Sequence, residues 1–292
     1  ASVTKVLSTA TALALAYQCG KLDLDAALGD WPQVELPAPL HALTIRELVT
    51  HTSGLSNRKP DPALHGEAAL ANWIDQTPAP RGERRFCYAC INAVLAGRVA
   101  EVCLDRTLDE ILASTITRPL GLDGVRFGPL EDSRRTVPTK PDQPAGWISD
   151  EPAQAIGRPL GNAGLFASVL DVARMATALL AAWRGNAGAI GLSPEAVAWM
   201  WRPVGNAADV PYAVLWDRRS PRATHHRPCW AGDEAVGHSG WVGHSLWVDP
   251  PRDRFVVALT NRSSMSDMAG PSQQTFIETT NRFRGMICDV TS

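Results

Sequence analysis

The sequence predicts an α+β fold in which a helical domain packs on a mostly antiparallel β-sheet that is flanked by helices. Two observations carry this prediction. Segments with apolar residues spaced near 3.6 residues fill the first two-thirds of the 292-residue chain, and short segments rich in aromatic and β-branched residues follow Gly205. Strands and helices do not alternate, as they do around a parallel sheet. We expect a mainly helical region over residues 1–205 and a sheet region over residues 206–292, which together make one unit.

The first helix is predicted to begin at Ser2. Residues from Val3 to Cys19 are small or apolar on nearly every face, so this helix should be buried, and Gly20 supplies a stop signal at its end. Further helices are predicted by apolar spacing at Thr44–Thr50, Ala68–Asp75, Cys90–Val102, Leu108–Ser114, Val169–Trp183 and Pro194–Met200.

Strands are predicted at Tyr212–Trp216, His244–Val248 and Arg254–Asn261. The turn Asp249–Asp253 separates the last two, which makes them an antiparallel hairpin. A final helix near Phe276–Ile287 is expected to cover the sheet.

Composition excludes several classes of function. The formal net charge of −2 gives no basic surface for nucleic acid, and no stretch is long and apolar enough to span a membrane. Six cysteines are too scattered for a disulfide framework, and the Cys87–Cys90 pair has no partner pair at zinc spacing, so we expect no metal and no cofactor. The compartment stays open, with a cytoplasmic location slightly favoured over a secreted one.

Ser2 and Lys5 form an S-x-x-K arrangement, in which one helical turn brings a hydroxyl and an amine to the same face. For the lysine to accept the serine proton it must be neutral, which requires a pKa shift from ~10.4 to near 7, or roughly 4–5 kcal/mol. A second S-x-x-K, Ser56–Lys59, is interpreted as a solvated loop because Lys59 precedes Pro60 and is pushed out of helical geometry.

A competing nucleophile motif is rejected. The segments Gly237–Trp241 and Gly243–Trp247 contain G-x-S, as in the G-x-S-x-G elbow, but tryptophan fills the last glycine position of both. The residues after Ser245 also have the pattern of a strand, whereas the elbow requires a helix there.

Further stretches accompany Ser2 and Lys5 along the chain. In order they are LTIRELVTHTSGL (43–55), FCYACINAVLAGRVAE (86–101), RPLGL (118–122), GNAGLFASVLDVARMATALL (161–180) and HSGWVGHSLWVDP (238–250). Together with ASVTK at the start, the chain resembles the serine β-lactamase and penicillin-binding protein superfamily over almost its whole length. The similarity is to the class C β-lactamase-like branch, which includes esterases, D-amino-acid peptidases and acyltransferases.

The resemblance implies catalytic roles for four residues. Ser2 is similar to the nucleophile that becomes acylated, and Lys5 to its partner base. Tyr88 falls at the tyrosine of a Y-x-N motif and would share proton transfer with Lys5. His238 begins the counterpart of a K-T-G strand. The alternatives are a buried tyrosine with a satisfied hydroxyl and an ordinary strand histidine.

The resemblance also implies substrate-binding residues. Ser239 and Gly240 continue the strand, where glycine lets the substrate lie close, and the backbone N–H of Trp241 would join that of Ser2 in an oxyanion hole. Leu165 and Phe166 are expected near the substrate. The turn at residues 51–55, the segment 161–165 and the helix-capping Asp171 are interpreted as structural.

Two departures from the family pattern carry information. Cys90 stands where the asparagine of Y-x-N would bind the amide of a β-lactam or peptide, and a thiol is a weak substitute, so ester chemistry is favoured over β-lactamase activity. The chain also begins directly at the serine motif, so we expect the family's opening strands to be a separate or missing segment.

The expected function is acyl transfer through an acyl-Ser2 intermediate in one catalytic unit, with a small-molecule ester, or an amide, as the substrate. The alternatives are an acyltransferase of small-molecule biosynthesis, a D-amino-acid peptidase or β-lactamase, and an inactive binding relative. Tryptophans of the sheet region suit either an apolar acyl pocket or the core: Trp216, Trp230, Trp241 and Trp247.

Overall fold

The computed structural model describes residues 1–77, 85–132, 134–139, 143–186, 188–205, 212–218 and 227–261. The α-helices are α1 (Ala10–Gln18), α2 (Ile45–Val49), α3 (Gly66–Asp75), α4 (Cys90–Leu104), α5 (Leu108–Leu112), α6 (Glu151–Ile156), α7 (Val169–Trp183) and α8 (Pro194–Trp201). The strands are β1 (Arg126–Phe127), β2 (Leu165–Phe166), β3 (Val236–Ser239), β4 (Ser245–Asp249) and β5 (Arg254–Ala258). Two π-helices, η1 (Lys5–Thr9) and η5 (Ala113–Thr117), and four 3₁₀-helices, η2 (Leu28–Asp30), η3 (Pro32–Val34), η4 (Ala38–Leu40) and η7 (Pro250–Arg252), are shorter.

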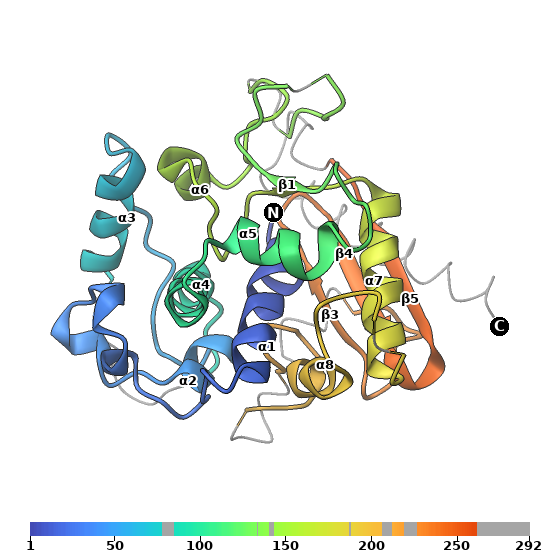
Figure 1. The fold of residues 1–292 in the computed structure, drawn as a ribbon. Helices are drawn as coiled ribbons and strands as arrows, with labels where there is room; N and C mark the ends of the chain where they lie inside the picture. Colours follow the sequence, from blue (N-terminus) through green and yellow to red (C-terminus); the bar gives the residue numbers. More distant parts are fainter. Residues whose placement is uncertain are drawn as a thin grey trace.

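Helix α1 lies in the middle of the molecule. Figure 1 shows helices α2, α3 and α4 on one side of it and strands β3, β4 and β5 on the other, with the start of the chain at the boundary between them. Helices α4 and α8 pack on α1, and α7 packs on β5. The α+β class predicted from the sequence is therefore confirmed, and the Ser2 turn lies where the helical part meets the sheet.

The first helix is confirmed, but its beginning is not regular α-helix: a tight first turn is followed by a wider π-helical one. Backbone bonds from Thr4 to Ala1 and from Lys5 to Ser2 form the first turn, and η1 then continues with π-helical spacing before α1 begins. Every residue of η1 is buried, the polar Lys5, Ser8 and Thr9 included. Single π turns inside helices are frequently found at functional sites.

The other predicted helices are also confirmed within a few residues of their expected bounds. Asp171 caps α7 as expected, because its carboxylate and the hydroxyl of Ser168 form a reciprocal capping box. Helix α6 was not predicted, because its six residues begin with Glu-Pro and are too short for a periodic pattern. Among the helices of the described part of the chain, none has the length and apolar character needed to cross a membrane.

The main sheet has the strand order β3-β4-β5, and both pairs are antiparallel. His238 pairs with Leu246 across β3 and β4, and Trp247 pairs with Val256 across β4 and β5. The predicted hairpin is confirmed, and η7 makes its turn. A second antiparallel pair, formed by the two-residue strands β1 and β2, was not predicted.

The prediction of a strand at Tyr212–Trp216 is wrong. Leu215 has a φ of +61°, and the segment folds back on itself: the Ala213 N–H donates to the carbonyl of Trp216 at 2.8 Å, and Tyr212 forms only an isolated antiparallel bridge with Asp217. All five side chains are buried, so their apolar run fits a buried loop as well as a strand. The helix predicted near Phe276–Ile287 lies outside the described residues.

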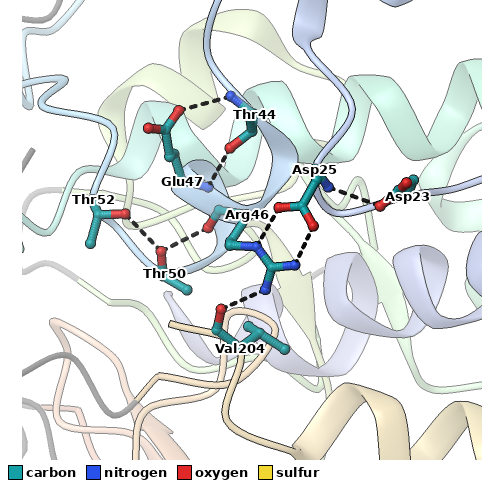
Figure 2. A network of polar contacts seen from close by, with 8 residues as sticks. All are labelled: Asp23, Asp25, Thr44, Arg46, Glu47, Thr50, Thr52 and Val204. Carbon is teal, nitrogen blue, oxygen red and sulfur yellow. Dashed lines mark hydrogen bonds and ion pairs between the residues drawn. The ribbon is translucent and has the colours of Figure 1, made fainter. Parts of the chain in front are cut away.

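Figure 2 shows how α2 is fixed in place beside the candidate site. Arg46 binds the Asp25 carboxylate through Nε at 2.6 Å and Nη2 at 2.7 Å, and its Nη1 donates to the carbonyl of Val204 at 2.7 Å. Thr44 and Glu47 form a capping box at the start of the helix. The loop that follows α2 therefore leaves from a fixed point.

The loop that carries Gly161 passes closely between the first helix and α4. The Gly161 carbonyl accepts a hydrogen bond from the Thr9 hydroxyl at 2.7 Å, and a Cβ added at Gly161 would lie 2.0 Å from the carbonyl oxygen of Ala93. Only glycine permits this approach.

We expect Gly161→Ala to lower the free energy of unfolding by about 3 kcal/mol or more, because the backbone of α4 must move to admit the methyl group. Gly124→Ala is the control, since its added Cβ would meet only a carboxylate oxygen of Asp171 at 3.4 Å, and it should change stability by less than about 1 kcal/mol. Urea unfolding of both variants measures this. Equal free energies of unfolding for the two variants would show that the contact between Gly161 and α4 is not tight.

Candidate active site

The Ser2 hydroxyl and the Lys5 amine are in direct contact. Lys5 is fully buried, and its Nζ lies 2.9 Å from Oγ of Ser2, 3.0 Å from the carbonyl oxygen of Asn162 and 3.5 Å from Sγ of Cys90. A lysine ammonium has three N–H donors and no acceptor. Three acceptors around Nζ therefore fit the charged form of the side chain.

The electrostatic surroundings favour the same state. Burial lowers the pKa of Lys5, but electrostatic interactions with Cys90 and Tyr88, a hydrogen bond with Tyr88 and the carboxylate of Asp150 outweigh it, so that the pKa is raised above its ordinary value. These contacts favour a charged Lys5, whereas the sequence analysis required a neutral Lys5 with a pKa near 7 for it to act as the base. The apolar surroundings that were expected to lower the pKa are present, but acceptors from three other segments compensate for them.

Tyr88 completes the contacts of the Ser2 hydroxyl. Its Oη lies 3.0 Å from Oγ of Ser2, and Nζ of Lys5 lies 5.3 Å from the centre of its ring. The ring of His238 lies on the strand side of Tyr88, with 5.9 Å between the ring centres. The structure thus brings together the four residues that the sequence proposed as catalytic.

The end of β3 lies against the backbone of Ser2. A Cβ added at Gly240 would be 3.4 Å from the Ser2 nitrogen and 2.8 Å from Cβ of Ala1, so a side chain here would press on the turn that carries Ser2. His238 and Ser239 are buried in β3, and Nδ1 of His238 donates to the carbonyl oxygen of Ser239 at 2.8 Å. Trp241 follows Gly240 and has 58% of its surface exposed.

The two residues of β2 lie differently. The Leu165 backbone N–H donates to the Thr4 hydroxyl at 3.1 Å, which places this residue beside the Ser2 turn. The Phe166 ring lies instead against Gly128, where an added Cβ would come within 2.5 Å of it. Phe166 therefore packs on the β1 side, and the structure does not bring its ring to the Ser2 hydroxyl.

The tryptophans divide between core and surface. Trp216 and Trp247 are 0% and 1% exposed, so both belong to the core. Trp230 stacks under the Arg254 guanidinium with 4.9 Å between them, and Trp241 alone of the four is largely exposed. An apolar acyl pocket built from all four tryptophans is therefore excluded.

The sequence analysis missed the residues that support this site. The Asn162 side chain donates from Nδ2 to Asp150 at 3.1 Å, and Asp150 also caps the start of α6. His51 and Asn57 contact the Tyr88 segment from the loop after α2. The GNAG and HTSG segments did signal Asn162 and His51, but only as structural turns, and Asn57 had no signal. No group of three or more histidine, cysteine, aspartate or glutamate side chains suited to a metal occurs within the described residues.

The arrangement of these elements is that of the serine β-lactamase and transpeptidase fold. A β-lactamase from Sulfitobacter sp. EE-36 superposes with a TM-score of 0.67 at 19% identity, covering 99% of this chain and 82% of that one. EstCE1, a hydrolase with promiscuous acyltransferase activity, has a TM-score of 0.65 at 21% identity over 96% of this chain and 84% of its own. At these identities the likeness concerns the fold.

Sequence comparison gives the family. The chain is 25% identical to a proposed D-alanyl-D-alanine carboxypeptidase of Escherichia coli O157:H7, over 94% of this chain and 70% of the relative. The model of the β-lactamase family matches residues 1–275. The chain belongs to the β-lactamase family of serine hydrolases, and the resemblance found in its sequence is confirmed.

The charged state of Lys5 can be measured directly, because the chain has only four lysines: Lys5, Lys21, Lys59 and Lys140. We expect the Lys5 ¹³Cε signal, identified by its loss in Lys5→Met, to keep its protonated shift through neutral pH and to titrate above the ordinary range of a lysine side chain. NMR titration of the side-chain signals makes the measurement. A transition near pH 7 would show that burial dominates and that Lys5 is a neutral base.

Proposed function

We propose that this enzyme transfers acyl groups through an acyl-Ser2 intermediate, with small-molecule esters as its substrates. The position of the Ser2 hydroxyl supports this most directly, since its Oγ lies 2.9 Å from Nζ of Lys5 and 3.0 Å from Oη of Tyr88. A serine hydroxyl is a weak nucleophile unless neighbouring groups take its proton. Here the Tyr88 phenol can relay the proton, and the Lys5 ammonium stabilises the charge that develops; both are within hydrogen-bond reach of Oγ.

The charge on Lys5 assigns the proton transfer to Tyr88. As Oγ of Ser2 bonds to the substrate carbonyl carbon, its proton passes to Oη of Tyr88, and the tyrosine proton passes to the leaving alkoxide. The ammonium of Lys5 stabilises the negative charge that builds up on the phenol oxygen and on Oγ. The alcohol leaves, and water, or another alcohol, then attacks the acyl group while Tyr88 relays its proton back to Ser2.

The oxyanion is assigned to two backbone donors. The N–H groups of Ser2 and Trp241 flank the Gly240 backbone, which the close approach of Gly240 to Ser2 brings beside the nucleophile. Because Gly240 has no side chain, a substrate carbonyl has access to both donors.

Cys90 favours an ester over an amide. Its Sγ lies 3.5 Å from Nζ of Lys5, inside the site, at the position where the family pattern has an asparagine. An amide substrate would there lose the hydrogen bonds of a carboxamide, whereas an ester has no N–H group that needs an acceptor. The likeness to EstCE1 in fold supports an esterase or acyltransferase, and the carboxypeptidase relative supports an amide substrate as the second candidate.

We expect a fluorophosphonate to add one adduct to the protein, on Ser2, and Ser2→Ala to abolish it. Ser8→Ala is the matched control, since Ser8 is a buried serine of the same helix and lies six residues away. Intact-protein and peptide mass spectrometry detect the adduct, and p-nitrophenyl acetate hydrolysis should fall at least about 1,000-fold in Ser2→Ala alone. A folded wild-type protein that forms no adduct would refute the proposal and favour a binding role.

The Cys90→Asn variant tests the substrate class. We expect it to raise kcat/KM for p-nitroanilides or β-lactams relative to p-nitrophenyl esters by about tenfold or more, because it restores a hydrogen-bonding carboxamide beside Lys5. Cys87→Asn makes the same chemical change at an exposed position and should leave the ratio unchanged. A wild-type enzyme that already prefers amides would contradict the ester assignment.

A further inference from the structure

Tyr88 lies in a short extended segment just before helix α4. Ala89, the N-cap residue of α4, has φ −137° and ψ 134°, so the chain is extended where it carries the tyrosine to the helix. In an extended chain, the backbone groups of successive residues point to opposite sides. Residues 87 and 89 therefore present their N–H groups on one side, and residues 88 and 90 present theirs on the other.

His51 binds the N–H groups of residues 87 and 89, on one side of the extended segment. Its carbonyl oxygen accepts from the N–H of Cys87 at 2.8 Å, and its Nδ1 accepts from the N–H of Ala89 at 3.4 Å. The imidazole is fully buried, and its ring centre lies 4.6 Å from that of Tyr88. A single residue thus binds the backbone on both sides of Tyr88 and also packs on its ring.

The neighbours of His51 determine its tautomer. Oδ1 of Asn92 accepts from the Ser53 hydroxyl at 2.6 Å, so the Nδ2 amino group of Asn92 faces Nδ1 of His51 at 3.1 Å. Two donors, from Asn92 and Ala89, therefore meet Nδ1, which must be unprotonated, and the ring proton is on Nε2. The backbone φ of +55° at His51 turns this ring under the tyrosine.

Asn57 binds backbone groups of residues 88 and 90, on the other side of the extended segment. Its Nδ2 donates to the carbonyl oxygen of Tyr88 at 3.3 Å, and its Oδ1 accepts from the N–H of Cys90, the first residue of α4. This second bond satisfies a donor that a helix N-terminus leaves without an intrahelical partner. Asn57 comes from the loop interpreted as solvated, and it is exposed there, yet its side chain binds the two residues that line the site.

We propose that His51 and Asn57 are positioning residues, which together form a clamp that sets the distance between the Tyr88 phenol and Ser2. This rests on the proposed function, because the clamp acts only through the proton transfer at Tyr88. Four hydrogen bonds from one loop, residues 51–57, bind four successive residues, 87–90. Neither His51 nor Asn57 is placed to touch the reacting atoms, since both act on the backbone of Tyr88 and its neighbours.

The clamp would act on the reaction rate by keeping the Tyr88 phenol oriented toward Ser2. Proton transfer requires the phenol oxygen to stay at hydrogen-bond distance from Oγ of Ser2, and a misplacement of about 1 Å can slow such a reaction about 100-fold. Loss of one half of the clamp leaves the tyrosine in place on average but lets it move. The clamp therefore affects kcat rather than KM.

The test is a double-mutant cycle with Asn57→Ala and His51→Asn, each made in the wild type and in Tyr88→Phe. Asparagine tolerates the positive φ at His51, so this variant keeps the backbone conformation. Arg58→Ala is the control. Arg58 is an exposed neighbour in the same loop, and its carbonyl, which the substitution keeps, accepts a hydrogen bond from Trp73. The measurements are kcat and KM for p-nitrophenyl acetate and the rate of Ser2 labelling by a fluorophosphonate.

We expect each clamp variant to lower kcat about tenfold or more with KM within about twofold, and to change the Tyr88→Phe enzyme by less than about twofold. Arg58→Ala should match the wild type in both backgrounds. Losses of equal size in the presence and absence of the Tyr88 hydroxyl would overturn the proposal, because a general structural role slows both enzymes alike.

Amide hydrogen exchange separates this proposal from the proposed function. Asn57→Ala should speed exchange in a peptide covering residues 86–91 by about tenfold, and Arg58→Ala should not. A wild-type protein with no acylation would refute the proposed function, and unchanged exchange in Asn57→Ala would then overturn the clamp as well. If the wild-type enzyme is active and the clamp variants lower kcat of Tyr88→Phe by the same factor as kcat of the wild type, the clamp alone is overturned.

Discussion

The arrangement of the site depends on one buried ammonium group. Lys5 is out of reach of solvent, and a charge in such a place is tolerated only where hydrogen bonds and opposite charge replace water. The replacement comes from Ser2 in its own turn, from Cys90 at the start of α4 and from the Asn162 carbonyl before β2. Segments far apart in the sequence are thus held together around one nitrogen, and the Ser2 hydroxyl is oriented by the same contacts.

Much of the fold could be predicted from the sequence, because periodic apolar spacing and turn residues are local signals. The capping of α7 and the hairpin around η7 are examples. The segment Tyr212–Trp216 could not be assigned correctly, since a run that is buried on all sides has no polar face to reveal its period. The two-residue strands β1 and β2 are too short to carry a pattern, and they exist only because the chain brings them side by side.

The candidate site, like the fold, could be predicted only in its local parts. Motif spacing predicted the contact between Ser2 and Lys5, because one helical turn joins them, and the family resemblance predicted that Tyr88 lies beside them. The surroundings of the Lys5 amine could not be predicted, since two of its acceptors lie 85 and 157 residues away along the chain. Asn57 was missed for a related reason: its partners lie 31 and 33 residues further on, in a segment that no local pattern connects to it.

The π-helical turn at Lys5–Thr9 has a consequence for how such a site can change over evolution. A π turn holds one residue more than an α turn, so it is what a single-residue insertion in a helix leaves behind. One residue corresponds to about 100° of rotation around the axis of an α-helix. The turn that carries Ser2 can therefore be rotated relative to α1 by one insertion or deletion, while the buried face of α1 keeps its packing. The turn of Ser2 and the core of this protein can, to that extent, change separately.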